Sequence, residues 1–294
     1  MPKLTSIETI VVGDGRCRWN LVRVAGDDGV AGWGEGSDCQ AVAWEHAVHD
    51  VFARRLLGEE ALPVPTRQRL GTRGASRLSG AADGFVLRTA ASSIEQAVWD
   101  LHARSMGVSL ATALGGALTD RVRIYANLNR GLTGTSPEDL ARAGAEAVAA
   151  GFDAVKCAPF RELDAHDPSC DVRVVADAGL ARVAALCDAV PSAVVHVDAH
   201  GRLNLASAPA IAAALAEFGV GWLEDPLGGE VPVGLEAVKA AAPTLPVAGG
   251  ELLAGWDPYD RLLQTPVDVV LTDIKHCGGH GALAETAALC RARN

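Results

Sequence analysis

The chain has 294 residues, of which 49% are hydrophobic and 21% charged, and it carries a formal net charge of −10. This composition is typical of a folded globular protein, and it excludes the disordered class. The negative charge argues against a surface for nucleic acid or an anionic membrane, and no apolar run approaches the roughly 20 residues of a membrane-spanning helix. Seven cysteines without a Cys-x-x-Cys pair fit reduced thiols. We therefore expect a cytoplasmic protein whose partner is a small molecule.

The first part of the chain has the alternating pattern of antiparallel strands, followed by helical periodicity. The expected strands are 3–12, 20–24 and 30–35, and the expected helices are 41–57 and 91–105. A turn at Asp27-Asp28-Gly29 separates the second strand from the third. These elements predict an α+β domain that covers residues 1–118.

From residue 122 onward, short apolar runs alternate with amphipathic stretches. The expected strands are 122–127, 154–158, 193–198, 221–224, 246–250 and 267–272, and the expected helices are 136–150, 171–189, 205–218, 231–242, 257–264 and 280–293. Six β-α units in series predict either a (β/α) barrel or a doubly wound sheet. We favour a TIM-like barrel over residues 119–294, because charged residues close the apolar runs and would meet at one mouth of a barrel.

Five of these runs have a charged residue at or close to their C-terminal end: Lys156, Asp198, Glu224, Glu251 and Asp273. Any one carboxylate there is equally consistent with a helix cap or a surface ion pair. Three acids on successive strands are different, because like charges gathered at one place repel unless a cation holds them. Carboxylate oxygens suit Mg²⁺. The sequence therefore predicts a magnesium site at Asp198, Glu224 and Glu251.

Longer motifs around these acids resemble the enolase superfamily. Three segments look like the strand ends that carry the metal ligands in that superfamily: Val-His-Val-Asp198-Ala-His, Trp-Leu-Glu224-Asp-Pro and Ala-Gly-Gly-Glu251. Its capping domain and the helix that leads into its barrel are similar to segments 33–36, 94–101 and 114–116. The resemblance covers essentially the whole chain. It implies an enolase-type barrel with an N-terminal capping domain, a Mg²⁺ cofactor, and removal of the proton α to a carboxylate.

Within that superfamily, the chain resembles the mandelate racemase branch. Leu252 follows Glu251 where the muconate-lactonizing branch usually has serine, and Asp273 falls where the racemase branch carries an aspartate. The segment from Asp198 to Arg202 is similar to that of the sugar-acid dehydratases, such as galactonate dehydratase, in which a histidine two residues after the first metal ligand transfers a proton. The resemblance implies dehydration of a sugar acid to a 2-keto-3-deoxy acid by a homo-oligomer.

Two residues are the expected proton-transfer groups. Lys156 is a candidate base or electrophile, because a neighbouring metal would lower the pKa of its ammonium group. The alternative for Lys156 is an ion pair with Asp198 or Glu224. His200, with an ordinary pKa of about 6.5, suits either removal of the α-proton or protonation of the departing hydroxyl, and its alternative is a histidine that only fills the rim. Ala158 stands where the family usually has a second lysine or arginine, which argues against racemisation.

Asp273 is the third candidate catalytic residue. In the racemase branch it orients a histidine at the end of the following strand, and this sequence ends at Asn294 before such a strand. We therefore expect a barrel without its last strands, either because the chain is a fragment or because a partner completes it. Lys275 and His276 are possible substitutes for the missing histidine, and one of them must point away if the strand alternates.

Three cations are candidate substrate-binding residues: Arg16 and Arg18, between the first two strands, and Lys275. The alternative for the two arginines is an exposed surface position. Two other functions remain open. One is a racemase, epimerase or cycloisomerase that acts on a carboxylate, and the other is a metal-binding fragment or assembly subunit without catalysis.

Overall fold

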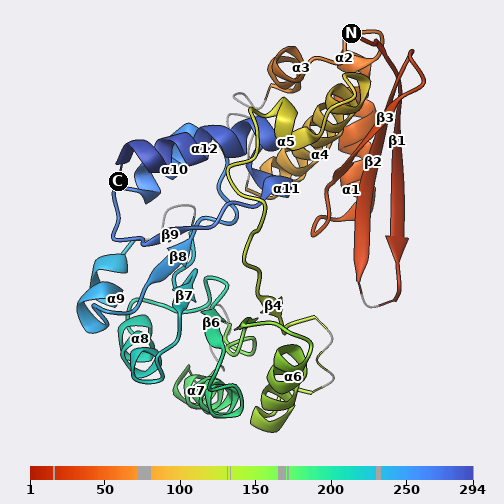
Figure 1. Cartoon of the computed structure of the whole chain (residues 1–294). Coiled ribbons are helices and arrows are strands. Elements are labelled where there is room, and N and C mark those ends of the chain that lie inside the picture. The colour runs from red at the N-terminus through yellow and green to blue at the C-terminus, as the bar shows by residue number, and fades with distance from the viewer. Residues whose placement is uncertain are drawn as a thin grey trace. The chain divides into compact units, whose positions relative to one another are not determined.

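The computed structural model describes residues 1–15, 17–71, 81–130, 132, 134–164, 170, 172–229 and 233–293, with the backbone alone at 81–83. The chain divides into two compact units. The first comprises Met1–Asp120, Glu251–Tyr259 and Thr272–Asn294, and the second comprises Arg121–Gly250 and Asp260–Leu271. This division groups two C-terminal segments with the N-terminal part, whereas the boundary at residue 118 expected from the sequence follows chain order. Figure 1 labels the elements of both units.

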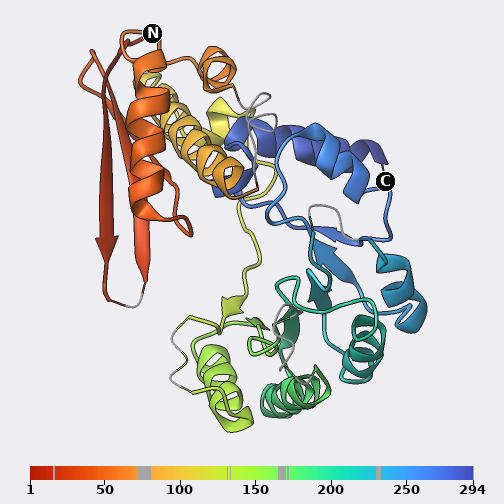
Figure 2. The ribbon, with the colours of Figure 1, turned by 180° about the vertical axis from the view of Figure 1, so that it is seen from behind.

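The first unit contains a three-stranded antiparallel sheet. Its strands are β1 (Leu4–Gly13), β2 (Arg18–Gly26) and β3 (Ala31–Glu35), in the order β1-β2-β3. Val22 and Val24 of the central strand are completely buried. The meander predicted from the alternating pattern is therefore present, and helices α1 and α4 lie along one side of it (Figure 1 and Figure 2).

The helices of the first unit are α1 (Ala41–His46), η1 (Ala47–Ala53), α2 (Arg54–Leu56), α3 (Pro63–Leu70), α4 (Ala81–Ser105), α5 (Leu110–Ala113), α11 (Ile274–Cys277) and α12 (His280–Arg293). The single helix expected at 41–57 contains a π-helical stretch, η1. Two glycines of β3 permit α4 to approach the sheet: a Cβ on Gly32 would lie 2.1 Å from the carbonyl oxygen of Ala97, and one on Gly34 would lie 2.0 Å from that of Ser93. A larger residue at either position would push α4 away.

The second unit contains six parallel strands in chain order, β4-β5-β6-β7-β8-β9. They are β4 (Ala126–Asn127), β5 (Ala154–Cys157), β6 (Val194–Asp198), β7 (Trp222–Glu224), β8 (Val247–Gly249) and β9 (Val269–Val270). The helices that alternate with them along the chain are α6 (Pro137–Ala149), α7 (Val172–Ala189), α8 (Ala208–Glu217), α9 (Leu235–Ala241) and α10 (Trp256–Leu262), of which α10 is divided between the two units after Tyr259. Each strand pairs with its neighbour in sequence, which is the arrangement of the expected β-α series.

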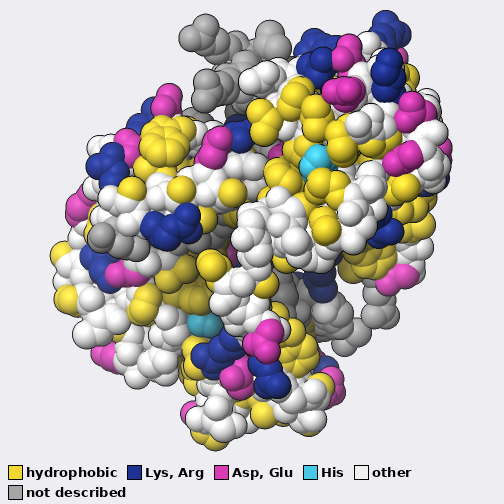
Figure 3. All heavy atoms as spheres, turned by 45° about the horizontal axis from the view of Figure 1, so that its top comes forward, with side chains coloured by type: hydrophobic (Ala, Val, Ile, Leu, Met, Phe, Trp, Pro, Cys, Tyr) yellow, Lys and Arg dark blue, Asp and Glu magenta, His cyan; other side chains and the backbone are white. Residues whose placement is uncertain are grey.

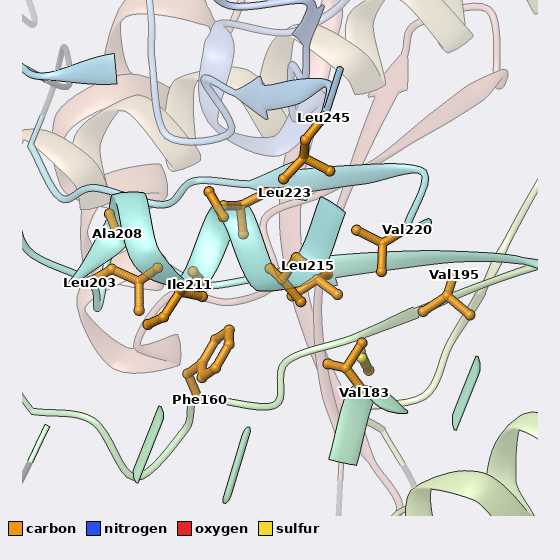
Figure 4. Packing of buried hydrophobic residues seen from close by; sticks show 14 of the residues in the cluster. Phe160, Val183, Val195, Leu203, Ala208, Ile211, Leu215, Val220, Leu223 and Leu245 are labelled. Atoms are coloured by element: carbon orange, nitrogen blue, oxygen red, sulfur yellow. The ribbon is translucent and has the colours of Figure 1, made fainter. Parts of the chain in front are cut away.

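Side chains of the strands alternate between two faces, and this alternation positions the site. One face packs on the helices, where Val195 and Leu223 meet Val183 of α7 and Leu215 of α8 in a single apolar cluster (Figure 4). Lys156 is adjacent in sequence to Val155 and so points to the other face, as do His196 and Asp198 on β6. Because the helices cover the first face with apolar groups, polar chemistry in this unit is concentrated on the second.

The surface carries charges of both signs, interspersed with apolar side chains over the face seen in Figure 3. Among the helices in the described parts of the chain, none combines the length and the apolar character needed to cross a membrane.

Candidate active site

Three charged side chains lie at the carboxyl ends of adjacent parallel strands in the second unit. Asp198 of β6 is in register with Glu224 of β7, and Lys156 of β5 is in register with the residue two positions before Asp198. The period of two then directs all three side chains to the same face of the sheet. The charged ends of the apolar runs predicted that these residues would converge, and the structure brings them together.

The three side chains form a buried ion-pair cluster. The ammonium nitrogen of Lys156 lies 2.5 Å from Oε1 of Glu224 and 3.3 Å from Oδ2 of Asp198. Lys156 is 6% exposed, Asp198 2% and Glu224 1%, so water screens these charges poorly. One ammonium group therefore faces two carboxylates in a region of low dielectric.

The electrostatics of the cluster follow from that imbalance of charge. Burial alone would lower the pKa of Lys156, but Glu224 and Asp198 outweigh it and raise the pKa above its usual value. Burial and the charge of Asp198 together raise the pKa of Glu224. Burial would also raise the pKa of Asp198, but hydrogen bonds from His200 and the charge of Lys156 lower it. With these two carboxylates beside it, Lys156 is an ammonium group in an ion pair, and its role as a base at a metal-bound site stays a prediction.

His200 is attached to the same cluster through Asp198. Its backbone N–H donates to Oδ1 of Asp198 at 2.9 Å, and its Nε2 lies 3.0 Å from Oδ2. The residue has a φ of +49°, a left-handed conformation that costs a non-glycine residue about 1–3 kcal/mol and is enriched at functional sites. The N–H of the following Gly201 donates to the carbonyl oxygen of Asp225 at 2.7 Å and stabilises this turn. Because 46% of its side chain is exposed, the imidazole is oriented and still reachable from solvent.

A group of rings that was not predicted from the sequence lies beside the cluster. Trp222 donates its indole N–H to Oε2 of Glu224 at 3.1 Å and stacks on His196, while Tyr125 meets both rings edge-on. The signal was present in the sequence: His196 and Trp222 each precede a predicted metal ligand by two residues, so the strand period places them on the ligand face.

Three predicted site residues belong to the first unit. Glu251 follows β8 by two residues and is half-buried. The carboxylate of Asp273 accepts a hydrogen bond from the backbone N–H of Lys275 at 2.7 Å and caps α11. The ammonium group of Lys275 binds the carboxylate of Asp38 and lies 3.3 Å from Oδ2 of Asp273.

The expected strand alternation at Lys275 and His276 is wrong, because both residues lie in helix α11. The helix is confined to a single turn by Asp273 at its N-terminus and by Gly278, with a φ of +117°, at its C-terminus. His276 is 2% exposed, with Nδ1 2.9 Å from the hydroxyl oxygen of Thr89 and Nε2 4.0 Å from Asp273. The imidazole is therefore packed against α4 rather than presented to a substrate.

The two arginines proposed to bind substrate are Arg16 and Arg18. Arg16 lies outside the described residues. Arg18 is exposed at the start of β2, where it pairs with Gly13 across the hairpin. Substrate binding by Arg18 stays a prediction.

The donor chemistry of the cluster fits a divalent cation. Asp198 and Glu224 are hard oxygen donors on adjacent strands, and one ammonium group does not neutralise both. Over the described ranges, no group of three or more His, Cys, Asp or Glu side chains is placed to hold a metal ion. The structure thus assembles two of the three predicted ligands within one unit.

Comparisons with known proteins cover both parts of the chain. Residues 2–115 match the family model described as mandelate racemase / muconate lactonizing enzyme, N-terminal domain, and residues 139–294 match the model described as enolase C-terminal domain-like.

Curated relatives and a solved structure agree with these family matches. The D-galactonate dehydratase of Ralstonia pickettii (strain 12J) is 31% identical over 279 residues, which cover 94% of this chain and 69% of the relative. The D-gluconate dehydratase of Thermoproteus tenax is 31% identical over 301 residues, which cover 99% of this chain and 59% of the relative. A crystal structure of a mandelate racemase/muconate lactonizing enzyme from Jannaschia sp. CCS1 superimposes with a TM-score of 0.84 at 27% identity, covering 99% of this chain and 78% of that chain.

Proposed function

Since the chain belongs to the mandelate racemase and muconate lactonizing enzyme family of the enolase superfamily, we propose that it is a magnesium-dependent dehydratase that converts a sugar acid to a 2-keto-3-deoxy acid. Its curated relatives are dehydratases, and the chain is a lyase of that type. The observation that carries the proposal is the buried cluster of Lys156, Asp198 and Glu224 at the carboxyl ends of three adjacent strands. D-galactonate and D-gluconate, named for the relatives, are the first substrates to test.

The proposed metal ligands are Asp198, Glu224 and Glu251. The first two are supported by their burial, their adjacent register and their uncompensated charge. Glu251 is supported by its place in the chain, two residues after the end of β8. When bound, Mg²⁺ would supply positive charge that stabilises the negative charge developing on the substrate carboxylate as the α-proton leaves.

The chain's own residues supply the proton transfers in this proposal. His200 carries a proton on its ring and delivers it to the departing β-hydroxyl, which leaves as water, and Asp198 holds the ring in place at 3.0 Å. Lys156 accepts the α-proton as a neutral amine: Asp198 and Glu224 hold it as an ammonium group in the ion pair, and a cation on these two carboxylates would lower its pKa. Asp273 remains a predicted catalytic residue. Loss of the α-proton and of the hydroxyl leaves an enol, which rearranges to the 2-keto group of the product.

The test is turnover of D-galactonate and D-gluconate with MgCl₂ in D₂O, followed by NMR. We expect formation of a 2-keto-3-deoxy acid, and we expect Glu224→Gln to abolish it. The exposed Glu217 of α8 provides the matched control, since Glu217→Gln should keep full activity.

Other outcomes identify the alternatives. Deuterium at the α-carbon without loss of water would favour an epimerase or racemase. Mg²⁺ binding without exchange or turnover of either acid would favour a metal-binding protein without catalysis. Full activity of Glu224→Gln would remove Glu224 from the proposed site.

A further inference from the structure

The two carboxylate oxygens of Glu224 have different partners. Oε1 lies 2.5 Å from the ammonium nitrogen of Lys156, and Oε2 accepts the indole N–H of Trp222 at 3.1 Å. A carboxylate held at both oxygens has its plane and its direction determined. The ammonium group of Lys156 carries a positive charge and would repel a cation. The indole of Trp222 is uncharged, so it can keep its hydrogen bond to Oε2 when a cation binds to Glu224.

The indole of Trp222 is itself held in place by two neighbouring rings. It stacks on the imidazole of His196, with 3.4 Å between ring centroids and 21° between planes. Tyr125 meets Trp222 edge-on at 5.8 Å and His196 at 5.7 Å. The orientation of the indole N–H is therefore set by packing on adjacent strands and not by its own rotamer alone.

His196 is suited to packing rather than to ionic contact. It is 8% exposed, and within the described residues its Nδ1 has no hydrogen-bond partner. A Cβ on Gly221 would lie 2.7 Å from both Nδ1 and Cε1 of the ring, so glycine at this position makes room for the stack.

We infer that Trp222 is a positioning residue for the metal site: its indole N–H holds Oε2 of Glu224, and its stacking on His196 sets the direction of that hydrogen bond. The inference rests on the proposed function, in which Glu224 binds Mg²⁺. Groups that hydrogen-bond to a metal ligand from outside commonly change metal affinity about 10–100-fold when they are replaced.

The experiment is calorimetric titration of MgCl₂ into the metal-stripped full chain. Trp222→Phe keeps an aromatic ring for the stack and removes the N–H donor. Trp99→Phe is the matched control, because Trp99 also is half-buried and donates its indole N–H to a buried glutamate, Glu95, at 2.9 Å, in the first unit. The unfolding temperature of both variants is measured in EDTA.

We expect Trp222→Phe to raise the Kd for Mg²⁺ by about tenfold. We expect Trp99→Phe to lower the unfolding temperature and to leave the Kd within about twofold of wild type, because its hydrogen bond supports α4 and no proposed ligand. A Kd for Trp222→Phe within about twofold of wild type overturns the inference while leaving the proposed function standing. Absence of Mg²⁺ binding by the wild-type chain overturns both.

A second variant covers the case in which Trp222→Phe does not fold. His196→Leu keeps apolar bulk but removes the ring on which the indole stacks. We expect the Kd for Mg²⁺ to rise in this variant as well, since the direction of the N–H is then less restricted. A folded His196→Leu variant with the wild-type Kd would overturn the inference.

Discussion

Replacement of Lys156 by methionine should separate the two roles of the buried cluster. Methionine fills a similar volume and removes the charge, so Asp198 and Glu224 are left facing each other without a counterion. Loss of one partner from a buried ion pair typically costs about 3–5 kcal/mol. Glu224, whose pKa burial and Asp198 already raise, can take up a proton and relieve part of this cost. We therefore expect the free energy of unfolding without metal to fall by about 3 kcal/mol.

The assay is urea unfolding in EDTA, followed by circular dichroism. Lys239→Met is the control, because Lys239 also pairs with one carboxylate, Asp268 at 2.9 Å, but at side-chain exposures of 20% and 42%. A partly exposed pair contributes about 0–1 kcal/mol, and the hydrogen bond that this ammonium group donates to the carbonyl oxygen of Leu245 at 2.9 Å adds about 1 kcal/mol, so this variant should lose clearly less stability than Lys156→Met.

Mg²⁺ and pH give two further readouts for Lys156→Met. The cation should bind this variant more tightly than the wild type, because it no longer shares the two carboxylates with an ammonium group. The raised pKa of Glu224 means that protonation favours the folded state, so the deficit in stability should grow as pH rises through that pKa. A deficit equal to that of Lys239→Met, or Mg²⁺ binding weaker than wild type, would contradict the role of Lys156 as the counterion of both carboxylates.

Three further predictions concern single residues. His200→Asn, which tolerates the left-handed backbone, should lower kcat by about 10²–10⁴-fold in the dehydratase assay at saturating Mg²⁺. Saturation is needed because the variant also loses the contact of the imidazole with Oδ2 of Asp198, a proposed ligand, and unchanged kcat would exclude proton transfer by His200. Glu95 is fully buried, and burial raises its pKa despite hydrogen bonds from two backbone N–H groups and Trp99. Its contribution to stability is therefore complete below the pKa of an unfolded glutamate and is lost as pH rises through the pKa of the folded state. The free energy of unfolding, measured against pH, should change less in Glu95→Gln than in the wild type. Gly34→Ala should lower the free energy of unfolding by about 1–3 kcal/mol, because its Cβ would lie 2.0 Å from the carbonyl oxygen of Ser93; an unchanged urea midpoint would mean that α4 shifts without cost.

Much of the fold was accessible from sequence pattern. The strands that carry Lys156, Asp198 and Glu224 were placed by short apolar runs between helical stretches, and their charged ends predicted which residues would meet. This worked because the period of a strand and the chain order of β-α units are local properties. The same local reasoning failed at Lys275 and His276, where a helix-capping aspartate and a left-handed glycine outweighed the expectation of a continuing strand.

That these charged groups end adjacent strands and face away from the helices follows from the amino-acid pattern alone, because side chains of a strand alternate with a repeat of two residues. Which atoms meet depends on the three-dimensional packing. Lys156 and Glu224 are 68 positions apart, and their contact depends on strand register, burial and side-chain direction together. The same holds for the indole of Trp222 on Glu224, because a stack of rings from neighbouring strands sets that hydrogen bond and leaves no repeating pattern in the chain.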